Sequence, residues 1–331
     1  MSKDSIQNLS EQWINLAQPR LGAEVISTTD DFFALKERLI KPDPPIFIPD
    51  KFDDHGKWMD GWESRRKRTP GHDHCIVRLG HPGSIKAIDI DTTHFIGNHP
   101  PHASLDACCS DADPSADTQW VELVARAVIE ADTHNRFEVE DSRPWSHVRL
   151  NIYPDGGVAR LRVYGEVYCD WNRYDKSDLL DLAAMEHGGR ALTCNDMHFG
   201  SIENLIAPGR GINMGDGWET RRRREPGHDW AILALGHVGI VKRIEVDTAN
   251  FKGNYPDRCS VQAARVTTGD LDTIVGQSTS WDTLLPEQKL QMDRQHFFET
   301  EIQDIGAITH VRFNIFPDGG VSRIRVFGHL G

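Results

Sequence analysis

Two clusters of charged and polar side chains each follow an Asp-Gly-Trp-Glu sequence. In the first cluster, two neighbouring arginines, a histidine and two carboxylates lie between Gly61 and Asp73. The members with useful chemistry are Glu63, Arg65, Arg66, His72 and Asp73. A guanidinium can hold a carboxylate through two parallel hydrogen bonds, and Glu or a His-Asp pair can exchange protons with a substrate. The cluster therefore predicts a site for a small, polar, charged substrate.

The second cluster holds the same residue types 156 positions later. Its members are Glu219, Arg221, Arg222, His228 and Asp229. A charge run is often only a solvated loop, but these residues stand in both clusters while their neighbours differ. We predict catalytic roles for the Glu, His and Asp of both clusters and substrate binding for the arginines. Trp230, which replaces His74 of the first cluster, could wall a pocket and slightly favours the second cluster.

An asparagine follows each cluster within the pattern Phe-x-Gly-Asn-x-Pro. These residues are Asn98 and Asn254. Their amide groups could hydrogen-bond a ureido group of a substrate or cap a turn, and the sequence leaves both interpretations open. We include both as candidate substrate-binding residues.

Metal ligands are not specified by this sequence. His72 and His74 are close together in the first cluster, but the second cluster has only His228. Paired cysteines, His-Glu-x-x-His and calcium-binding loops do not occur, and neither do glycine-rich phosphate or dinucleotide fingerprints. We therefore expect no metal and no other cofactor, with a metal-bound water as the alternative route.

An internal duplication organises the chain. Residues 60–100 align without gaps on residues 216–256 with 24 identities in 41 positions. Residues 147–165 match residues 310–328 with 14 identities in 19 positions. Weaker similarity links 27–40 to 194–207, so the first copy carries extra residues near Lys-Pro-Asp-Pro-Pro-Ile-Phe-Ile-Pro-Asp-Lys-Phe. Such self-similarity indicates two copies of one structural unit.

We predict four segments from this duplication. They are an N-terminal segment 1–19, a first repeat 20–168, a linker 169–186 and a second repeat 187–331. At roughly 150 residues, each repeat is long enough to bury its own core.

Each repeat has the sequence pattern of β-structure. Apolar and polar residues alternate over strand lengths, and Pro-Asp-Gly-Gly turns precede further strands. This spacing predicts an all-β fold with a sandwich or jelly roll in each repeat. Short helices are expected at 30–40, 120–130 and 282–291.

Three arginines in each copy alternate along a predicted strand region. They are Arg149, Arg160 and Arg162 in the first copy and Arg312, Arg323 and Arg325 in the second. Alternation places such side chains on one sheet face, which we interpret as a solvated or inter-subunit face. We also expect a homo-oligomer.

Charge and composition exclude several classes of protein. The chain has 331 residues and a formal net charge of −13, which disfavours a nucleic-acid binder. It has no apolar run long enough to span a membrane and no signal-peptide pattern. The six cysteines form no Cys-x-x-Cys pair and are expected to be free thiols. We expect a cytoplasmic protein that does not associate with membranes.

The doubled Asp-Gly-Trp-Glu block, the Phe-x-Gly-Asn-x-Pro segments and the doubled His-Val-Arg-x-Asn-Ile-x-Pro-Asp-Gly-Gly-Val block together resemble allantoicase, a family built of two allantoicase repeats. The resemblance covers nearly the whole chain. It implies two jelly-roll β-sandwich domains similar to galactose-binding modules. It also implies hydrolysis of allantoate to ureidoglycolate and urea in purine catabolism, by a hydrolase that acts on C–N bonds of linear amidines.

The chemistry of allantoate suits the predicted clusters. Its carboxylate requires a cation, its ureido groups require carboxylate or amide acceptors, and loss of urea requires a general acid followed by a base for water addition. The alternative interpretation is a non-catalytic tandem carbohydrate-binding β-sandwich protein, since fold does not fix function. Aromatic platforms would favour that alternative, whereas the repeated loops offer mainly Arg, Glu and His.

Overall fold

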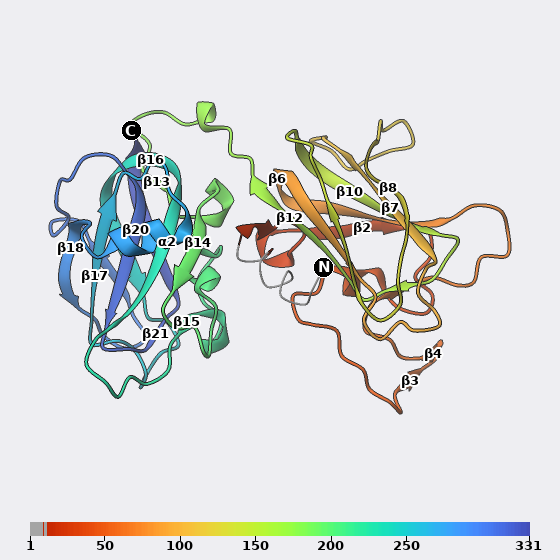
Figure 1. Cartoon of the computed structure of the whole chain (residues 1–331), viewed down its shortest axis with the longest axis horizontal. Coiled ribbons are helices and arrows are strands. Elements are labelled where there is room, and N and C mark those ends of the chain that lie inside the picture. Colours follow the sequence, from red (N-terminus) through yellow and green to blue (C-terminus); the bar gives the residue numbers. More distant parts are fainter. Residues whose placement is uncertain (1–8, 10–11) are drawn as a thin grey trace. The chain divides into compact units, whose positions relative to one another are not determined.

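The computed structural model describes residue 9 and residues 12–331, so the predicted N-terminal segment lies partly outside it. The chain divides into two compact units, residues 1–168 and 169–331 (Figure 1). The predicted linker residues 169–186 therefore fall within the second unit, where Leu180–Asp181 pairs with the last strand. Among the described residues, no helix has both the length and the apolar character needed to cross a membrane.

Most regular elements of the first unit are antiparallel strands. They are β1 (Ile14–Asn15), β2 (Glu24–Thr28), β3 (Phe52–Asp53), β4 (Gly56–Lys57), β5 (Trp62–Glu63), β6 (Asp73–Asp91), β7 (His102–Cys108), β8 (Val121–Val128), β9 (His134–Glu138), β10 (Pro144–Tyr153), β11 (Gly157–Val158) and β12 (Arg160–Val167). Short 3₁₀ turns occupy Pro19–Leu21 and Lys36–Ile40.

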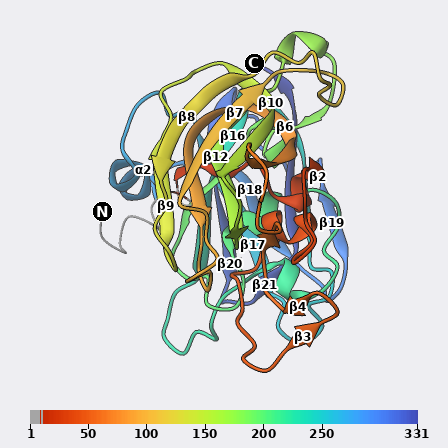
Figure 2. The same cartoon turned by 90° about the vertical axis from the view of Figure 1, so that its right-hand side faces the viewer.

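The 19-residue strand β6 connects the two halves of this unit. Its first part pairs with β10 and β2, and its second part pairs with β12 and β9. The register shifts between Arg78 and Gly83, where the strand passes from one set of neighbours to the other. Beyond β10 the sheet continues through β7 to β8, which lie side by side in Figure 2.

The second unit repeats this arrangement. Its elements are β13 (Leu180–Asp181), β14 (Arg190–Cys194), β15 (Trp218–Glu219), β16 (Asp229–Asp247), β17 (Arg258–Ala264), α2 (Leu271–Ser278), β18 (Asp282–Lys289), β19 (Gln295–Phe298), β20 (Ile308–Phe316), β21 (Gly320–Val321) and β22 (Arg323–Leu330), with 3₁₀ turns at Trp171–Arg173, Met185–His187, Ile202–Ile206 and Met214–Asp216. The sheet order β13-β22-β16-β20-β17-β18 matches β1-β12-β6-β10-β7-β8. The predicted all-β fold in two repeats is confirmed.

Two of the three predicted helices are wrong, and the third forms only as a short 3₁₀ helix. Residues 120–130 form β8, because Val121, Val124 and Val128 suit a strand and pair with β7. Residues 282–291 contain β18, where Pro286 would have interrupted a helix. Only the 3₁₀ turn at Lys36–Ile40 forms in the region 30–40. The α-helix α2 was not predicted; the Asp270 side chain caps it by accepting the Thr273 N–H at 2.9 Å.

The interpretation of the alternating arginines as a solvated face is wrong for Arg160, Arg312 and Arg323, all of which are buried. The side chains of Arg160 and Arg323 are 1% and 2% exposed. Arg160 donates to the Asp60 carboxylate and to the carbonyl of Asp43, and Arg323 donates equivalently to Asp216 and Gly209. Each guanidinium is buried because it donates hydrogen bonds to the loop that leads into the Asp-Gly-Trp-Glu sequence, and these bonds hold that loop in place.

Gly157 is required by the packing of Phe95 beneath the Pro-Asp-Gly-Gly turn. A Cβ at position 157 would lie 2.1 Å from Phe95 Cε1. We expect Gly157→Ala to lower the free energy of unfolding by about 1–3 kcal/mol, because the buried ring must move. Denaturant unfolding measures this. Gly253→Ala, where a Cβ has open space, serves as the control, and equal stability of the two variants would contradict the packing argument.

All six cysteines are free, and their exposure differs. Cys109 is exposed, whereas Cys75 and Cys259 are buried, and burial raises the pKa of the Cys259 thiol to about 12. Because the thiolate is the reactive form, we expect a thiol reagent to modify Cys109 first in the native protein. All six cysteines should react in denaturant. Peptide mapping after timed alkylation checks this, and early labelling of Cys259 would contradict it.

Candidate functional site

Glu63 and Asn98 form the central pair of the first unit. Glu63 ends β5, which pairs with β11, and Asn98 lies in the loop after β6. Asn98 Nδ2 donates to Glu63 Oε1 at 2.9 Å. Burial raises the pKa of the Glu63 carboxyl, and the Asn98 hydrogen bond opposes that shift only in part. A carboxyl that stays protonated to higher pH is suited to donate a proton.

A cavity of about 450 Å³ adjoins this pair. It is lined by Phe33, Phe47, His55, Gly56, Lys57, Met59, Glu63, His94, Ile96, Gly97 and Asn98. Phe47 comes from the extra segment of the first copy, and His55, Gly56 and Lys57 come from the β3–β4 hairpin that directly follows it (Figure 1). Sequence reasoning noted the extra residues but named none of them as site residues. The signal that could have identified them is that the second copy lacks this segment.

Lys57 is a cation at this cavity and lies on β4. It is exposed, and its Nζ lies 4.4 Å from the centroid of the Phe47 ring. His55 of the same hairpin stacks on Phe32 with ring centroids 4.3 Å apart. The hairpin therefore brings a positive charge, an imidazole and their aromatic contacts to the cavity that Glu63 also lines.

Arg65 and Arg221 bind carboxylates of their own units. The Arg65 backbone N–H and Nε donate to the two carboxylate oxygens of Asp30 at 2.9 and 2.7 Å. Arg221 makes the same two bonds to Asp196. The buried indole of Trp62 donates to the Asp30 carbonyl at 2.8 Å, which fixes this corner. In both units the arginine holds the loop to the preceding segment.

Asp73 and Asp229 are almost fully buried at the starts of β6 and β16. Lys67 Nζ and Thr29 Oγ1 donate to the Asp73 carboxylate at 2.5 and 2.9 Å. Arg223 and Asn195 donate to Asp229 in the second unit. These contacts fix the turn between the Glu and the His of each cluster.

The two cluster histidines have aromatic neighbours. His72 lies against Tyr153 with ring centroids 4.6 Å apart, and His228 lies against Phe316 at 4.7 Å. Burial lowers the pKa of His228, although its contact with Asn314 at 3.3 Å opposes this. The structure thus joins Glu63 to Asn98 and Asp73 to Lys67, and it places His72 in a separate set of contacts.

The second unit repeats the pair without the hairpin. Asn254 Nδ2 donates to Glu219 Oε1. A cavity of about 440 Å³ lies beside the arginine-rich loop and is lined by Asn195, Asp196, Arg221, Arg222, Arg223, Arg224, Glu225 and Asp229. Trp230 packs on the Arg312 guanidinium at 4.3 Å and against the cluster that includes Ile232 and Trp281. Arg66 and Arg222 are exposed and make no ion pair within the described part of the chain.

The residues that the structure describes include no group of three or more His, Cys, Asp or Glu side chains placed to hold a metal ion. The catalytic and substrate-binding roles assigned from the sequence stay predictions, as does the expectation of no cofactor.

Comparison with known proteins gives a consistent result. The family of the allantoicase repeat matches residues 14–168 and 180–331. The chain is 55% identical to probable allantoicase 1 of Burkholderia mallei over all of its length and 98% of that protein. It is 56% identical to probable allantoicase of Ralstonia nicotianae, covering 98% of this chain and 96% of that one. The crystal structure of allantoicase from Saccharomyces cerevisiae aligns with a TM-score of 0.83 at 33% identity, with 99% of both chains covered.

Proposed function

The chain belongs to the allantoicase family, and we propose that it hydrolyses allantoate to ureidoglycolate and urea at the cavity beside Glu63. The observation that carries this assignment is the half-buried Glu63 carboxyl with its raised pKa, held by Asn98 against that cavity. The family membership supports a hydrolase of C–N bonds in linear amidines over the carbohydrate-binding alternative.

The reaction begins with proton transfer from Glu63. Its carboxyl proton moves to the nitrogen that links one ureido group to the central carbon of allantoate. The bond between that carbon and that nitrogen breaks, urea leaves, and the lone pair of the other ureido nitrogen forms a C=N bond. The Glu63 carboxylate then takes a proton from water as the water oxygen adds to the same carbon, which gives the hydroxyl of ureidoglycolate.

Asn98 and Lys57 hold the substrate in this scheme. The Asn98 amide keeps the Glu63 carboxyl in one orientation and has its carbonyl oxygen to accept a ureido N–H. The Lys57 ammonium attracts the substrate carboxylate, which a chain of net charge −13 otherwise repels at long range. The predicted arginine clamp at Arg66 or Arg222 is the competing assignment for the carboxylate.

A urea-release assay with allantoate tests the function. Purified protein should release one urea per allantoate consumed between pH 6 and 9, with no release from arginine. The same assay before and after chelator treatment tests the expectation that no metal takes part. No urea release at any pH, with or without added divalent metal, would refute the proposal.

We also propose that the chain acts as a homo-oligomer in the cytoplasm. Six free cysteines suit a reducing compartment. Phe52 and Ile96, on and beside the hairpin, are 67% and 69% exposed, which suits burial against another copy. Light scattering coupled to size-exclusion chromatography should give a mass above 37.4 kDa. A monomer at micromolar concentration would contradict the oligomer.

A further inference from the structure

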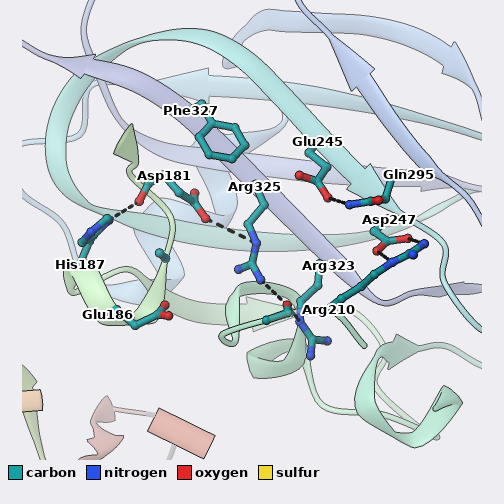
Figure 3. Close-up of a pocket in the computed structure, with 12 residues that line it drawn as sticks. Asp181, Glu186, His187, Arg210, Glu245, Asp247, Gln295, Arg323, Arg325 and Phe327 are labelled. Carbon is teal, nitrogen blue, oxygen red and sulfur yellow. Dashed lines mark hydrogen bonds and ion pairs between the residues drawn. The ribbon is translucent and has the colours of Figure 1, made fainter. Parts of the chain in front are cut away.

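A second polar cavity of about 440 Å³ lies in the second unit, and its lining includes neither Glu219 nor Asn254. Figure 3 shows the residues around it. It is lined by Asp181, Ala184, Glu186, His187, Gly209, Arg210, Glu245, Asp247, Gln295, Arg323, Arg325 and Phe327. The residues come from β13, β16, β19 and β22 and from the loops before β15. None of them was named as a candidate site residue from the sequence, although Arg323 and Arg325 were noted among the alternating arginines.

Two of the three arginines at this cavity, Arg323 and Arg210, donate hydrogen bonds to other groups of the protein. Arg323 donates to Gly209, Ser322 and Asp216, as described for the loop it ties down. Arg210 donates through Nε and Nη2 to the two oxygens of Asp247 at 2.8 and 3.3 Å. The Arg323 guanidinium makes four hydrogen bonds within the protein, whereas Arg210 uses two of its five N–H groups on Asp247 and keeps the others available beside a ligand.

Asp181, Glu245 and Arg325 also retain hydrogen-bonding capacity toward the cavity. Arg325 Nη2 donates to the carbonyls of Ala207 and Gly209, but its Nε lies 3.6 Å from Asp181 Oδ2, too far for a hydrogen bond. Asp181 Oδ1 accepts the backbone N–H groups of Val326 and Ala183, which leaves Oδ2 facing Arg325.

Glu245 completes this set from the neighbouring strand. It stands opposite Arg325 in the β16–β22 register, so the two side chains share one sheet face. Gln295 donates to Glu245 Oε1 at 2.7 Å, and no bond to Oε2 is found within the described part of the chain. Figure 3 shows Asp181, Arg325 and Glu245 around the same opening, with Phe327 beside them.

We propose that this cavity binds a ureido or carbamoyl compound, with its carbonyl oxygen on Arg325, its N–H groups on Asp181 and Glu245, and one face on Phe327. A urea unit presents donor, acceptor and donor along its edge, which complements carboxylate, guanidinium and carboxylate. Burial raises the pKa of Asp181 against the opposing effect of Arg325, and an N–H donated by the ligand would relieve that desolvation. The site is separate from the reaction at Glu63 and does not rest on it.

The first unit lacks this arrangement at the equivalent place. Asn15 replaces Asp181, and its Oδ1 accepts the equivalent backbone N–H groups of Val163 and Ala17. Asp89 replaces Glu245 and is paired with His134 at 2.8 Å. The carboxylate at 181 is therefore not needed to hold the local backbone, because an amide does the same in the first copy. A ligand role explains why the second copy has the acid.

Saturation-transfer NMR with N-methylurea and the full-length protein tests the proposal. We expect Asp181→Asn and Glu245→Gln each to weaken binding by about tenfold or more, the effect of losing a hydrogen bond to a charged group. Asp181→Asn should fold normally because Asn15 occupies the same position in the first unit. Asp272→Asn, an exposed change on α2, is the matched control and should bind as the parent does.

Two further measurements separate this cavity from the catalytic one. Binding should persist in Glu63→Gln, whatever that variant does to urea release. Guanidinium should compete less well than N-methylurea, because it has no oxygen to accept an N–H of Arg325. Unchanged affinity in both Asp181→Asn and Glu245→Gln, loss of binding in Glu63→Gln, or stronger binding of guanidinium would each overturn the proposal.

Discussion

Glu63→Gln is expected to slow urea release from allantoate by about 100-fold or more, since general acid catalysis commonly contributes factors of 10² to 10⁴. The glutamine keeps a carbonyl oxygen that can accept the Asn98 amide N–H, so the pair retains its geometry. It removes the proton that Glu63 would give to the departing ureido nitrogen. The loss should therefore appear in kcat, with a smaller change in KM, in steady-state assays of the purified variant.

Glu219→Gln is the matched control from the second unit. It removes the equivalent carboxylate from the equivalent Asn254 contact, but the second copy has no β3–β4 hairpin beside it. We expect it to retain most of the activity. The reverse result, with Glu219→Gln inactive and Glu63→Gln active, would move the catalytic site to the second unit. Near-parent turnover in both variants would show that neither glutamate transfers the proton.

The pH profile gives an independent check on Glu63. Burial raises the pKa of this carboxyl, so its protonated form persists to higher pH than that of an exposed glutamate. A general acid acts in that form, and the rate should fall as the pH rises through the raised pKa. This limb of the profile should disappear in Glu63→Gln. A parent enzyme whose rate rises across the same range would contradict the assignment of Glu63 as the acid.

The duplicated fold was predictable because its signals are local and occur twice. Alternating apolar residues in β6 and β16, and the glycines of the turn before β12, determine strands and turns within a few residues. The helix at 120–130 was predicted wrongly because short apolar periodicity suits either structure until a neighbouring strand is known. Its Val124 pairs with Leu105 on β7, a contact that no local pattern reveals.

The candidate site was predictable only in part, for a related reason. Glu63 and Asn98 were named from motifs that recur in both copies, and they do meet. The ion pair between Arg65 and Asp30 could not be inferred, because Asp30 lies outside the motif and 35 positions away from Arg65. The hairpin residues were missed because comparing the two copies draws attention to what they share, whereas this segment occurs in one copy alone.

Lys57→Met is expected to raise KM for allantoate by about tenfold, equivalent to about 1.4 kcal/mol of binding free energy. The reasoning starts from the substrate, an anion, and from the lining of the cavity at Glu63, where Lys57 supplies a full positive charge. Its Nζ is held near the Phe47 ring at 4.4 Å but, among the described residues, makes no ion pair that a substrate would have to displace. Lys57→Arg keeps the charge and should restore most of the affinity.

Lys51→Met controls for changes to the hairpin itself. Lys51 immediately precedes β3, and its ammonium lies 3.8 Å from the centroid of the Trp58 ring, outside the lining of the cavity. It should leave KM near the parent value. Arg66→Lys and Arg222→Lys test the competing clamp, since lysine keeps the charge but loses the bidentate geometry. If Lys57→Met leaves KM unchanged while either arginine variant raises it tenfold, the carboxylate is held by the arginine loop and the hairpin has another role.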